Sequence, residues 1–454
     1  MKADQNRSII LGGGPSGLMV AKTLAERNIR TLLIDFPNLS LQTFLPGNQA
    51  FKHQHRSELG GNCKYWGGQV AYMTELDLQL FVNLAGLDIE QLAKIKNEME
   101  QLSTEFSLPF DINNKYHEII DESSCLNIET FYSTYVDNLN ILELLEINHF
   151  LENDMIAIQR AEVLGIEIED GYCSKIILKD MDNLVVKRNT PVCVALGTTK
   201  STELLVSVPE ICQNFKRYSP SDHPHGYVAA FTCEKKNVFY RSPVVNARGQ
   251  KFKRKFLLDS DVSETKGLVE LHYDYNGNFF PDFVAIDSSL IKSVRFLVNR
   301  ILLRLTGRAR SYPEIFWACV QVEKTRDFLS NTVEANSLES KGRLNSLDIG
   351  NIVSIQEKFI SLMNASGFQL LWKAEVNDIC NFFSDAFHPS GTLESIEKTN
   401  QRVAESFGKV GRVENLFVSS ACTWPVSSWT NPTFMLMVFA RLIGREILAF
   451  LKKA

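Results

Sequence analysis

A glycine pattern near the N-terminus is typical of loops that hold a phosphate. Gly12, Gly14 and Gly17 follow an apolar stretch, and the residues after them have the composition of a helix opened by Pro15. In this pattern the first glycine permits a tight turn, the second lets backbone approach a pyrophosphate, and the third allows close helix packing. Asp35 follows, where a carboxylate can accept from a ribose hydroxyl. We therefore predict dinucleotide binding, without separating FAD from NAD; the alternative is a glycine turn needed only for packing.

A second glycine-rich segment is Leu59-Gly-Gly-Asn-Cys-Lys-Tyr-Trp-Gly-Gly68. It places four glycines around an aromatic pair, which suits a backbone laid flat against a planar ring or a phosphate. A glycine-rich hairpin is the alternative explanation.

Two further segments carry groups that could act on a substrate. His388 stands before a turn in Asp385-Ala-Phe-His-Pro-Ser-Gly-Thr392, and a neutral histidine suits proton transfer because its usual pKa, about 6.5, lies near working pH. One histidine among eight is more often structural than catalytic, so the pattern alone does not settle its role. From Glu414 the chain predicts a strand, a polar loop and a helix with Asn431 as N-cap and Pro432 in its first turn.

Metal and disulfide chemistry have weaker signals. His223 and His225 could form a metal pair, but no third ligand lies nearby, so we expect a turn and no metal site. The nine cysteines include no CxxC pair, which favours buried free thiols and a reducing compartment. The polar first residues leave no room for a signal peptide, and no stretch has about 18 uninterrupted apolar residues. We expect a cytoplasmic protein without a spanning helix.

The elements that must position these groups follow from the apolar pattern. Strands at 8–11 and 31–34 flank a helix and form a βαβ unit with a right-handed crossover. A helical, acidic segment follows from about 76 to 152, then alternating strands at 156–179 and a buried strand at 191–197. Further alternating strands, and a helix near 290–305, predict a second lobe before the chain returns to the first.

Charge is distributed unevenly along the 454 residues. The formal net charge of −5 disfavours a general nucleic-acid binder. Between 241 and 314, however, thirteen basic residues stand against eight acidic ones. The helix expected near 290–310 has arginines around an apolar face, and two interpretations stay open. It contacts an anionic membrane surface or guides an anionic or lipid-linked substrate, or it packs on the lobe with its arginines solvated.

Six ordered segments of this sequence resemble the glucose–methanol–choline (GMC) family of FAD-dependent oxidoreductases, with the sugar-oxidising bacterial members as the nearest. They are the N-terminal glycine pattern, Gly60-Gly61…Trp66-Gly67-Gly68, Val194 to Leu205, Ser221-Asp-His-Pro224, His388-Pro-Ser-Gly-Thr392 and the final Asn-Leu-Phe-Val…Pro…Asn-Pro-Thr run. The resemblance implies an enzyme that oxidises a CH–OH group of an alcohol, sugar or glycoconjugate by hydride transfer to flavin N5. His388 matches the family's active-site histidine, acting as base, and Asn431 its second active-site position.

The resemblance also implies the cofactor contacts. They fall on Gly12, Gly14, Pro15, Ser16, Gly17, Asp35, Gly60, Gly61, Asn62, Cys63, Trp66, Gly67, Gly68, Val163, Gly197, Ser420, Ala421, Pro432 and Thr433, with Thr202 in the same domain. Val163 would lie near the adenine, and Ser420 with Ala421 near the pyrophosphate or ribityl chain. Tyr65 stands where some relatives carry a histidine bonded to the flavin, so we expect non-covalent FAD. Two other departures are Val418-Ser-Ser-Ala-Cys422 and Leu393-Glu394.

The expected fold is α/β, with a Rossmann-like, doubly wound FAD-binding domain interleaved with a smaller α+β substrate domain. The FAD-binding domain would comprise residues 1–75, 153–240 and 380–454, and the substrate domain 76–152 and 241–379. Two other functions stay open: a lyase that keeps FAD on the same scaffold, and a flavin-binding accessory protein without turnover. Family members often run longer, which suggests a short substrate lobe and an open site for a bulky substrate. The electron acceptor is not specified by the sequence.

Overall fold

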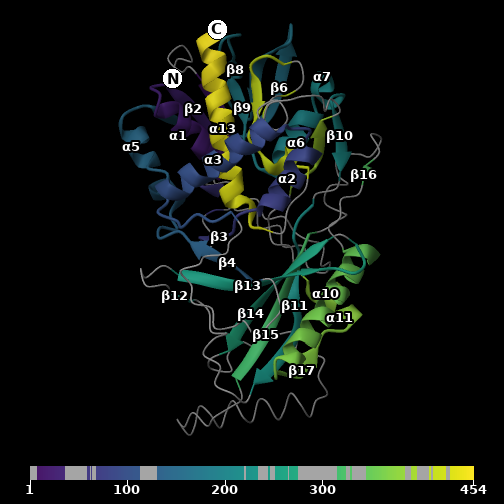
Figure 1. Cartoon of the computed structure of the whole chain (residues 1–454). Coiled ribbons are helices and arrows are strands. Elements are labelled where there is room, and N and C mark those ends of the chain that lie inside the picture. Colours follow the sequence, from purple (N-terminus) through teal and green to yellow (C-terminus); the bar gives the residue numbers. More distant parts are fainter. Residues whose placement is uncertain are drawn as a thin grey trace.

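The structure is a computed structural model of the chain, organised by one parallel and one large antiparallel sheet. It describes residues 8–35, 59–61, 63, 68–112, 130–218, 221–233, 244–245, 251–263, 265–274, 314–323, 328–329, 344–383, 390–395, 408, 410, 413–425 and 430–453. In Figure 1 the parallel sheet and its helices form the upper part, and the antiparallel sheet extends below them. The helix expected at 290–305 lies outside the described residues.

The parallel sheet has the strand order β19-β9-β1-β2-β5. Its strands are β1 (Ser8–Leu11), β2 (Thr31–Asp35), β5 (Ile156–Arg160), β9 (Val192–Val194) and β19 (Leu416–Val418), and all neighbours run parallel. The chain adds strands outward from β1 on one side, then returns to add β9 and β19 on the other. The expected α/β fold with a doubly wound sheet is confirmed. Such sheets bind ligands outside the carboxyl ends of the strands where the order reverses, here between β1 and β9.

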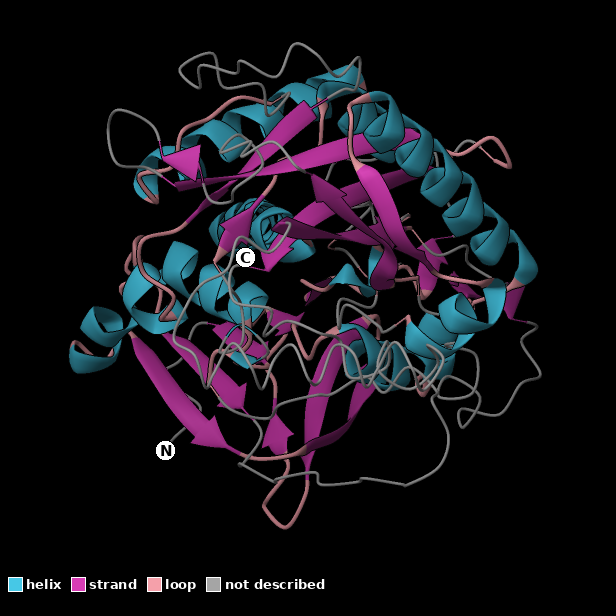
Figure 2. Cartoon of the chain, turned by 90° about the horizontal axis from the view of Figure 1, so that it is seen from below, coloured by secondary structure: helices cyan, strands magenta, loops and turns pink. Residues whose placement is uncertain are grey.

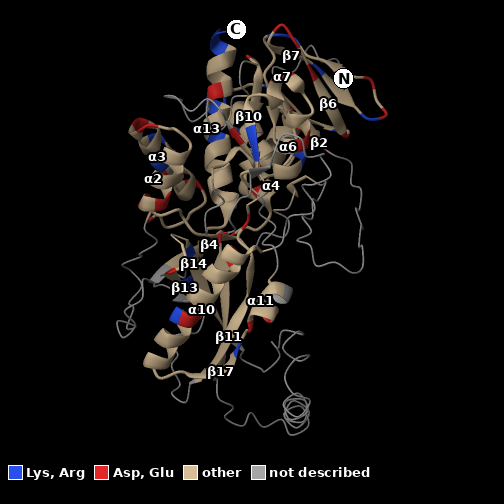
Figure 3. Ribbon diagram, turned by 90° about the vertical axis from the view of Figure 1, so that its right-hand side faces the viewer, with Lys and Arg blue, Asp and Glu red and all other residues tan. Residues whose placement is uncertain are grey.

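Alternate residues of the parallel sheet enter two different cores. Ile10 joins α1 (Pro15–Ala25) and α13 (Pro432–Lys453), whereas Ile9 and Leu11 face the opposite side. That side is covered by α6 (Thr198–Val206) and by a sheet of β6 (Val163–Glu169), β7 (Tyr172–Leu178) and β8 (Leu184–Val185). A fully buried Ile or Leu contributes roughly 1.5–3 kcal/mol, so a strand apolar on both faces is held firmly in place. Helix α13 ends in Lys452 and Lys453, coloured blue at the end marked C in Figure 3, where they complement the helix dipole.

The helical segment expected after residue 76 is present, with one strand inside it. It comprises α2 (Glu75–Leu84), α3 (Ile89–Glu105), α4 (Ile141–Leu144) and α5 (Ile147–Glu152), interrupted by β4 (Thr130–Tyr135). The Asp88 side chain caps α3 by accepting from the backbone of Gln91 at 2.9 Å. Since β4 pairs with β13, this segment also contributes an inner strand to the antiparallel sheet.

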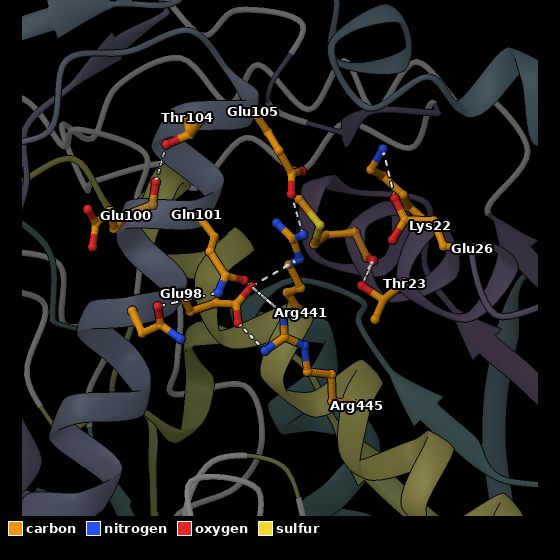
Figure 4. Close-up of polar contacts among 12 residues, drawn as sticks. Lys22, Thr23, Glu26, Glu98, Glu100, Gln101, Thr104, Glu105, Arg441 and Arg445 are labelled. Carbon is orange, nitrogen blue, oxygen red and sulfur yellow. Dashed lines mark hydrogen bonds and ion pairs between the residues drawn. The ribbon is translucent and has the colours of Figure 1, made fainter.

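A buried ion network ties α3 to α13 (Figure 4). The Glu98 carboxylate, 1% exposed, lies 3.0 Å from Arg441 Nε and 2.5 Å from Arg445 Nη1. Arg441 also pairs with Glu105. Burial raises the pKa of Glu98, and the two arginines oppose that rise. The inserted helices are thus fixed to the helix whose first turn lies at the candidate site.

The large antiparallel sheet has the order β17-β11-β15-β14-β13-β4-β3, with β12 beside β13. Its remaining strands are β3 (Gln69–Val70), β11 (His225–Cys233), β12 (Val244–Val245), β13 (Lys251–Asp259), β14 (Lys266–Asp274), β15 (Glu314–Val322) and β17 (Gln369–Lys373). One face packs on α10 (Ser346–Ala365) and α11 (Val376–Phe382), through alternate residues such as Val269 and Leu271. Seen from below, helices lie along much of the rim, and one helix is seen nearly end-on among the strands, near the end marked C (Figure 2).

A fourth, small sheet joins segments that lie far apart in the chain. It contains β10 (Phe215–Tyr218), which follows α7 (Pro209–Cys212), with β16 (Phe328–Leu329) and β18 (Leu393–Ser395) on either side. Strand β11 belongs to the large sheet, and the division of the chain into two domains stays a prediction. Among the described helices, none is both long and apolar enough to cross a bilayer.

Candidate functional site

The turn after β1 can contain only glycine at two positions. Gly12 has φ +109°, and a Cβ there would lie 2.3 Å from the carbonyl oxygen of Ala195, after β9. A Cβ on Gly17 would lie 2.0 Å from the Gly12 carbonyl oxygen. Both glycines are therefore required for the close approach of α1 to the carboxyl ends of β1 and β9, at the switch point of the sheet.

Asp35 is bound to this same turn. The Gly13 backbone N–H donates to Asp35 Oδ1 at 3.0 Å, and a Cβ on Gly13 would lie 2.9 Å from the Asp35 carboxyl carbon. Arg160 Nη1 lies 3.8 Å from Asp35 Oδ2. The carboxylate is buried at the carboxyl end of β2, in the position that suits a ribose hydroxyl.

The start of α1 has the features of an anion site. Gly14 is its N-cap with extended backbone and no side-chain cap, Pro15 is the first helical residue, and the first turn contains no acidic residue. A Cβ on Gly14 would meet no atom within 4 Å, so the backbone here borders open space. The helix dipole and the first-turn N–H groups favour a negative ligand in that space. These residues fit a pyrophosphate.

The second glycine segment lies directly against the first. Gly60 N donates to the Gly13 carbonyl at 2.7 Å, and a Cβ on Gly61 would lie 3.3 Å from Gly14 Cα. The buried Cys63 thiol is hydrogen-bonded to Thr433 in the first turn of α13, while burial raises the pKa of Cys63 to about 12. The second glycine segment thus joins the start of α1 to the start of α13, and all three regions were predicted to contact the cofactor. Asn62, Tyr65, Trp66 and Gly67 lie outside the described residues.

Gly68 is the last residue of the second glycine segment, and its backbone also needs a glycine. It has φ +70°, a backbone conformation that favours glycine, and its carbonyl accepts from Val136 N at 2.9 Å. The chain passes from there into β3 of the large sheet.

The loop after β19 reaches the same place. Ser16 Oγ lies 2.6 Å from the Ser419 carbonyl, to which it donates, and 2.5 Å from Ser419 Oγ. Ser420 caps the short 3₁₀ turn η5 (Ala421–Thr423) by accepting from Cys422 N at 3.2 Å. Ser420 and Ala421 therefore lie beside the start of α1. The Ser16–Ser419 contact joins this helix start to the loop after β19, at the switch point of the sheet.

Two further segments of the family resemblance pack on that loop. Gly391 N donates to the Ala421 carbonyl at 2.8 Å, and Thr392 Oγ1 lies 2.5 Å from Thr202 Oγ1 in α6. Ser390 forms a reciprocal pair with Ser221, with N–H to carbonyl distances of 2.8 and 2.9 Å. His388 lies outside the described residues, two positions before this pair.

The remaining predicted residues are at the ends of elements. Asn431 is partly buried directly before α13, whose first residues are the buried Pro432 and Thr433. Gly197 is the N-cap of α6 with φ +76°. Val163 is the first residue of β6. It follows Ala161 by two residues, and the Ala161 N–H donates to the Asp35 carbonyl at 2.9 Å. Apart from Gly68, Val163 and Gly197, the described members of the predicted set thus lie at or beside the starts of α1 and α13.

Sequence reasoning missed three positions that build the site. Gly13 binds both Asp35 and Gly60, Ser419 binds Ser16, and Thr392 binds Thr202. The unbroken Gly12-Gly13-Gly14 run was a usable signal for Gly13, because three successive glycines exceed what the pattern needs. Nothing in the local sequence indicates the two hydroxyl pairs, whose members are far apart in the chain.

The two histidines of the possible metal pair lie at the start of β11. His223 is buried before this strand, His225 begins it, and no described group of three or more potential ligands could hold a metal. The seven cysteines whose side chains the structure describes are all free, five of them buried.

Comparison with known proteins supports the fold. No protein-family model matches the sequence, and no curated protein matches it. Pyridoxine 4-oxidase from Mesorbium loti has a similar structure, with a TM-score of 0.57 and 12% identity over 97% of this chain and 99% of that chain. An FAD-dependent oxidoreductase from Chaetomium thermophilum gives 0.56 and 12% over 98% and 99%. A fungal aryl-alcohol oxidase gives 0.53 and 11% over 98% and 99%. At these identities the likeness shows that the whole chain shares one fold with these proteins.

Proposed function

We propose that this chain is an FAD-dependent oxidoreductase that oxidises a CH–OH group, as its resemblance to the GMC family implies. The observation that carries the proposal is the convergence of separate segments on the start of α1. Gly60 bonds to Gly13, Ser16 to Ser419, and Gly391 to Ala421, although the partners are far apart in the sequence. Structures of similar fold include proteins described as FAD-dependent oxidoreductase and alcohol oxidase.

The residues fit FAD at two helix starts. The uncapped first turn of α1, bordered by Gly14 and Gly61, would hold the pyrophosphate, and Asp35 the adenosine ribose. The first turn of α13, with Cys63 bonded to Thr433, would border the flavin end. A nicotinamide dinucleotide needs only the first helix start of this fold. The second helix start and the second glycine segment, which bonds to it through Cys63, therefore support FAD.

The catalytic proposal assigns one role to each of two residues. FAD, when bound, supplies the hydride acceptor. Asn431, at the start of α13, would hold the alcohol oxygen by its side-chain amide, and His388 would accept the hydroxyl proton. A neutral imidazole suits this step because its usual pKa, about 6.5, lies near working pH.

An anaerobic screen of alcohols for bleaching of the flavin tests the proposal. A set of benzyl, sugar and aliphatic alcohols is mixed with the purified protein, and loss of flavin absorbance identifies turnover. His388→Ala should abolish bleaching while the protein keeps its FAD. His149→Ala, an exposed histidine on α5, is the matched control and should bleach as the wild type does. A screen in which no alcohol bleaches the flavin would favour the lyase or the accessory protein.

The proposal includes non-covalent FAD, because Tyr65 stands where some family members have the flavin-linked histidine. Acid precipitation should release the yellow colour into the supernatant. Colour that stays in the pellet would contradict this part alone.

A cytoplasmic location is also proposed. The seven described free cysteines support a reducing compartment. Fractionation of expressing cells, followed with an antibody to the chain, tests it, and recovery in an oxidising compartment would contradict it.

A further inference from the structure

The large sheet has a charged face opposite the helix-covered one. Along β14, Val269 and Leu271 pack toward α10, so Glu270 and His272 point the other way. On β13, Phe256 and Leu258 pack toward α10, which leaves Lys253 and Lys255 on the face with Glu270. Charged side chains on the inner strands of a sheet are unusual unless they are paired or serve a ligand.

These side chains form one connected cluster with Tyr227, which we call the Lys253 cluster: Tyr227, Lys253, Lys255, Glu270 and His272. Lys255 Nζ lies 2.6 Å from Glu270 Oε1, and Lys253 pairs with Oε2 of the same carboxylate. His272 Nε2 lies 3.2 Å from Glu270 Oε2, and Tyr227 Oη lies 2.9 Å from His272 Nδ1. Lys253 Nζ also lies 3.5 Å from His272 Nε2, so this ring nitrogen is close to both the ammonium group of Lys253 and the carboxylate of Glu270.

The cluster contains more positive than negative charge. Two ammonium groups share one carboxylate, and the side chains of Lys255, Glu270 and Lys253 are 3%, 13% and 18% exposed. Burial lowers the pKa of Lys255 by more than the Glu270 carboxylate raises it. Burial also raises the pKa of Glu270, but Lys255, His272 and Lys253 outweigh it and leave that pKa well below its usual range. Within the part of the chain that the structure describes, these two ammonium groups have one carboxylate between them; such an excess of buried charge is costly, and an anion would offset that cost.

The cluster adjoins the candidate site. Strand β11 starts just after the Ser221–Ser390 pair, and Leu257 and Leu268 pack on Ala71, three residues beyond Gly68. His225 and Gln321 form the row of the sheet nearest those contacts, and Tyr227 with Cys319 forms the next. Cys319 is in turn paired with Glu270. Two residues along a strand span about 7 Å, so the cluster lies one row of side chains beyond the cofactor-side edge.

We propose that the Lys253 cluster is an anion-binding subsite, which receives the carboxylate or phosphate of an alcohol substrate. Lys253 and His272, the more exposed members at 18% and 30%, would contact the anion, while Lys255 stays with Glu270. As a substrate assignment this rests on the proposed function. It narrows the substrate to an alcohol that also carries an anionic group.

Binding can be measured without turnover, by calorimetry of the full-length protein with benzoate and with phenyl phosphate. Wild type should bind one or both, more weakly as salt is raised. The tighter ligand distinguishes a carboxylate from a phosphate site. Lys253→Met should weaken binding by at least about tenfold, and Lys253→Arg by about threefold or less. Lys358→Met, which removes a lysine from the α10 side of the same lobe, should leave binding unchanged.

Two outcomes overturn the subsite: no heat of binding with either anion, or equal binding by wild type and Lys253→Met. Should Lys253→Met fail to fold, His272→Gln serves in its place, with weaker binding expected and equal binding contradicting the proposal. Bleaching of the flavin by an alcohol of the screen, or by an alcohol that carries a carboxylate or phosphate, tests the proposed function separately. Bleaching without anion binding at Lys253 leaves the function standing and removes the subsite. Anion binding that depends on Lys253, without bleaching by any alcohol, leaves the subsite and removes the function.

Discussion

The backbone N–H of Gly13 donates to Asp35 Oδ1 at 3.0 Å, across 22 residues of sequence. This bond fixes the position of the glycine turn after β1 relative to the acid at the end of β2 before any ligand binds. The other carboxylate oxygen, Oδ2, lies 3.8 Å from Arg160 Nη1. Protein contacts therefore hold in place the turn and the carboxylate that we propose bind the pyrophosphate and the adenosine ribose.

Asp35→Asn should weaken FAD binding by about tenfold, since a hydrogen bond from a ribose hydroxyl to a charged acceptor is lost. The amide oxygen of the substituted side chain can still accept from the Gly13 N–H, so the fold should persist. Titration of the flavin-free protein with FAD and with FMN measures the effect, because FMN lacks the adenosine ribose. An equal loss of affinity for both flavins would show that Asp35 acts only through the turn.

Gly14→Ala and Gly17→Ala should have opposite consequences. The Gly17 Cβ would lie 2.0 Å from a backbone oxygen, so this variant should lose about 1–3 kcal/mol in the free energy of unfolding of the flavin-free protein. The Gly14 Cβ meets no atom within 4 Å, so its variant should unfold like the wild type but bind FAD poorly. Urea unfolding and FAD titration separate the two effects. Normal FAD binding by Gly14→Ala would contradict the phosphate position.

Glu98→Gln should lower the free energy of unfolding by about 3 kcal/mol, because two arginines of α13 lose their buried counter-charge. The matched control is Glu90→Gln on the same helix. Its partner Lys94 is 49% exposed, and the change should cost less than about 0.5 kcal/mol. Urea denaturation of both variants gives the comparison. Similar small losses in both would mean that the network contributes no more than a surface pair.

Glu270 makes stability depend on pH in a defined direction. Its folded-state pKa is well below the usual 4.5, so the unfolded chain binds more protons at acidic pH. The stabilisation is complete above about 4.5 and is lost as the pH falls toward the folded-state value. Glu270→Gln should therefore be less stable than wild type by about 3 kcal/mol at neutral pH, with a difference that shrinks under acid.

Urea unfolding over a pH series measures that difference. Glu357→Gln, whose carboxylate is 54% exposed, is the control and should match the wild type throughout. A Glu270→Gln deficit that grows as the pH falls would contradict the assignment.

The sequence by itself determined the parts of the site that depend on local chain geometry. The strand, glycine turn, Pro15 and helix form one continuous unit, and their spacing alone implies a turn that admits a phosphate. The same holds for Asn431 and Pro432, which mark the start of a helix wherever that helix lies. The order β1, α1, β2 also predicted a parallel sheet, because a short crossover through a helix leaves little other choice.

Only the tertiary structure decided which distant residues meet. Ser16 and Ser419 lie 403 positions apart, and Thr202 and Thr392 lie 190 apart, so no local pattern could pair them. The Lys253 cluster was equally hidden. A strand reading Lys-Phe-Lys-Arg-Lys predicts lysines in solvent, whereas pairing with β4 and β14 buries Lys255 and partly buries Lys253 around Glu270. Burial and charge pairing are properties of the assembled sheet, and they appear only when its strands are in register.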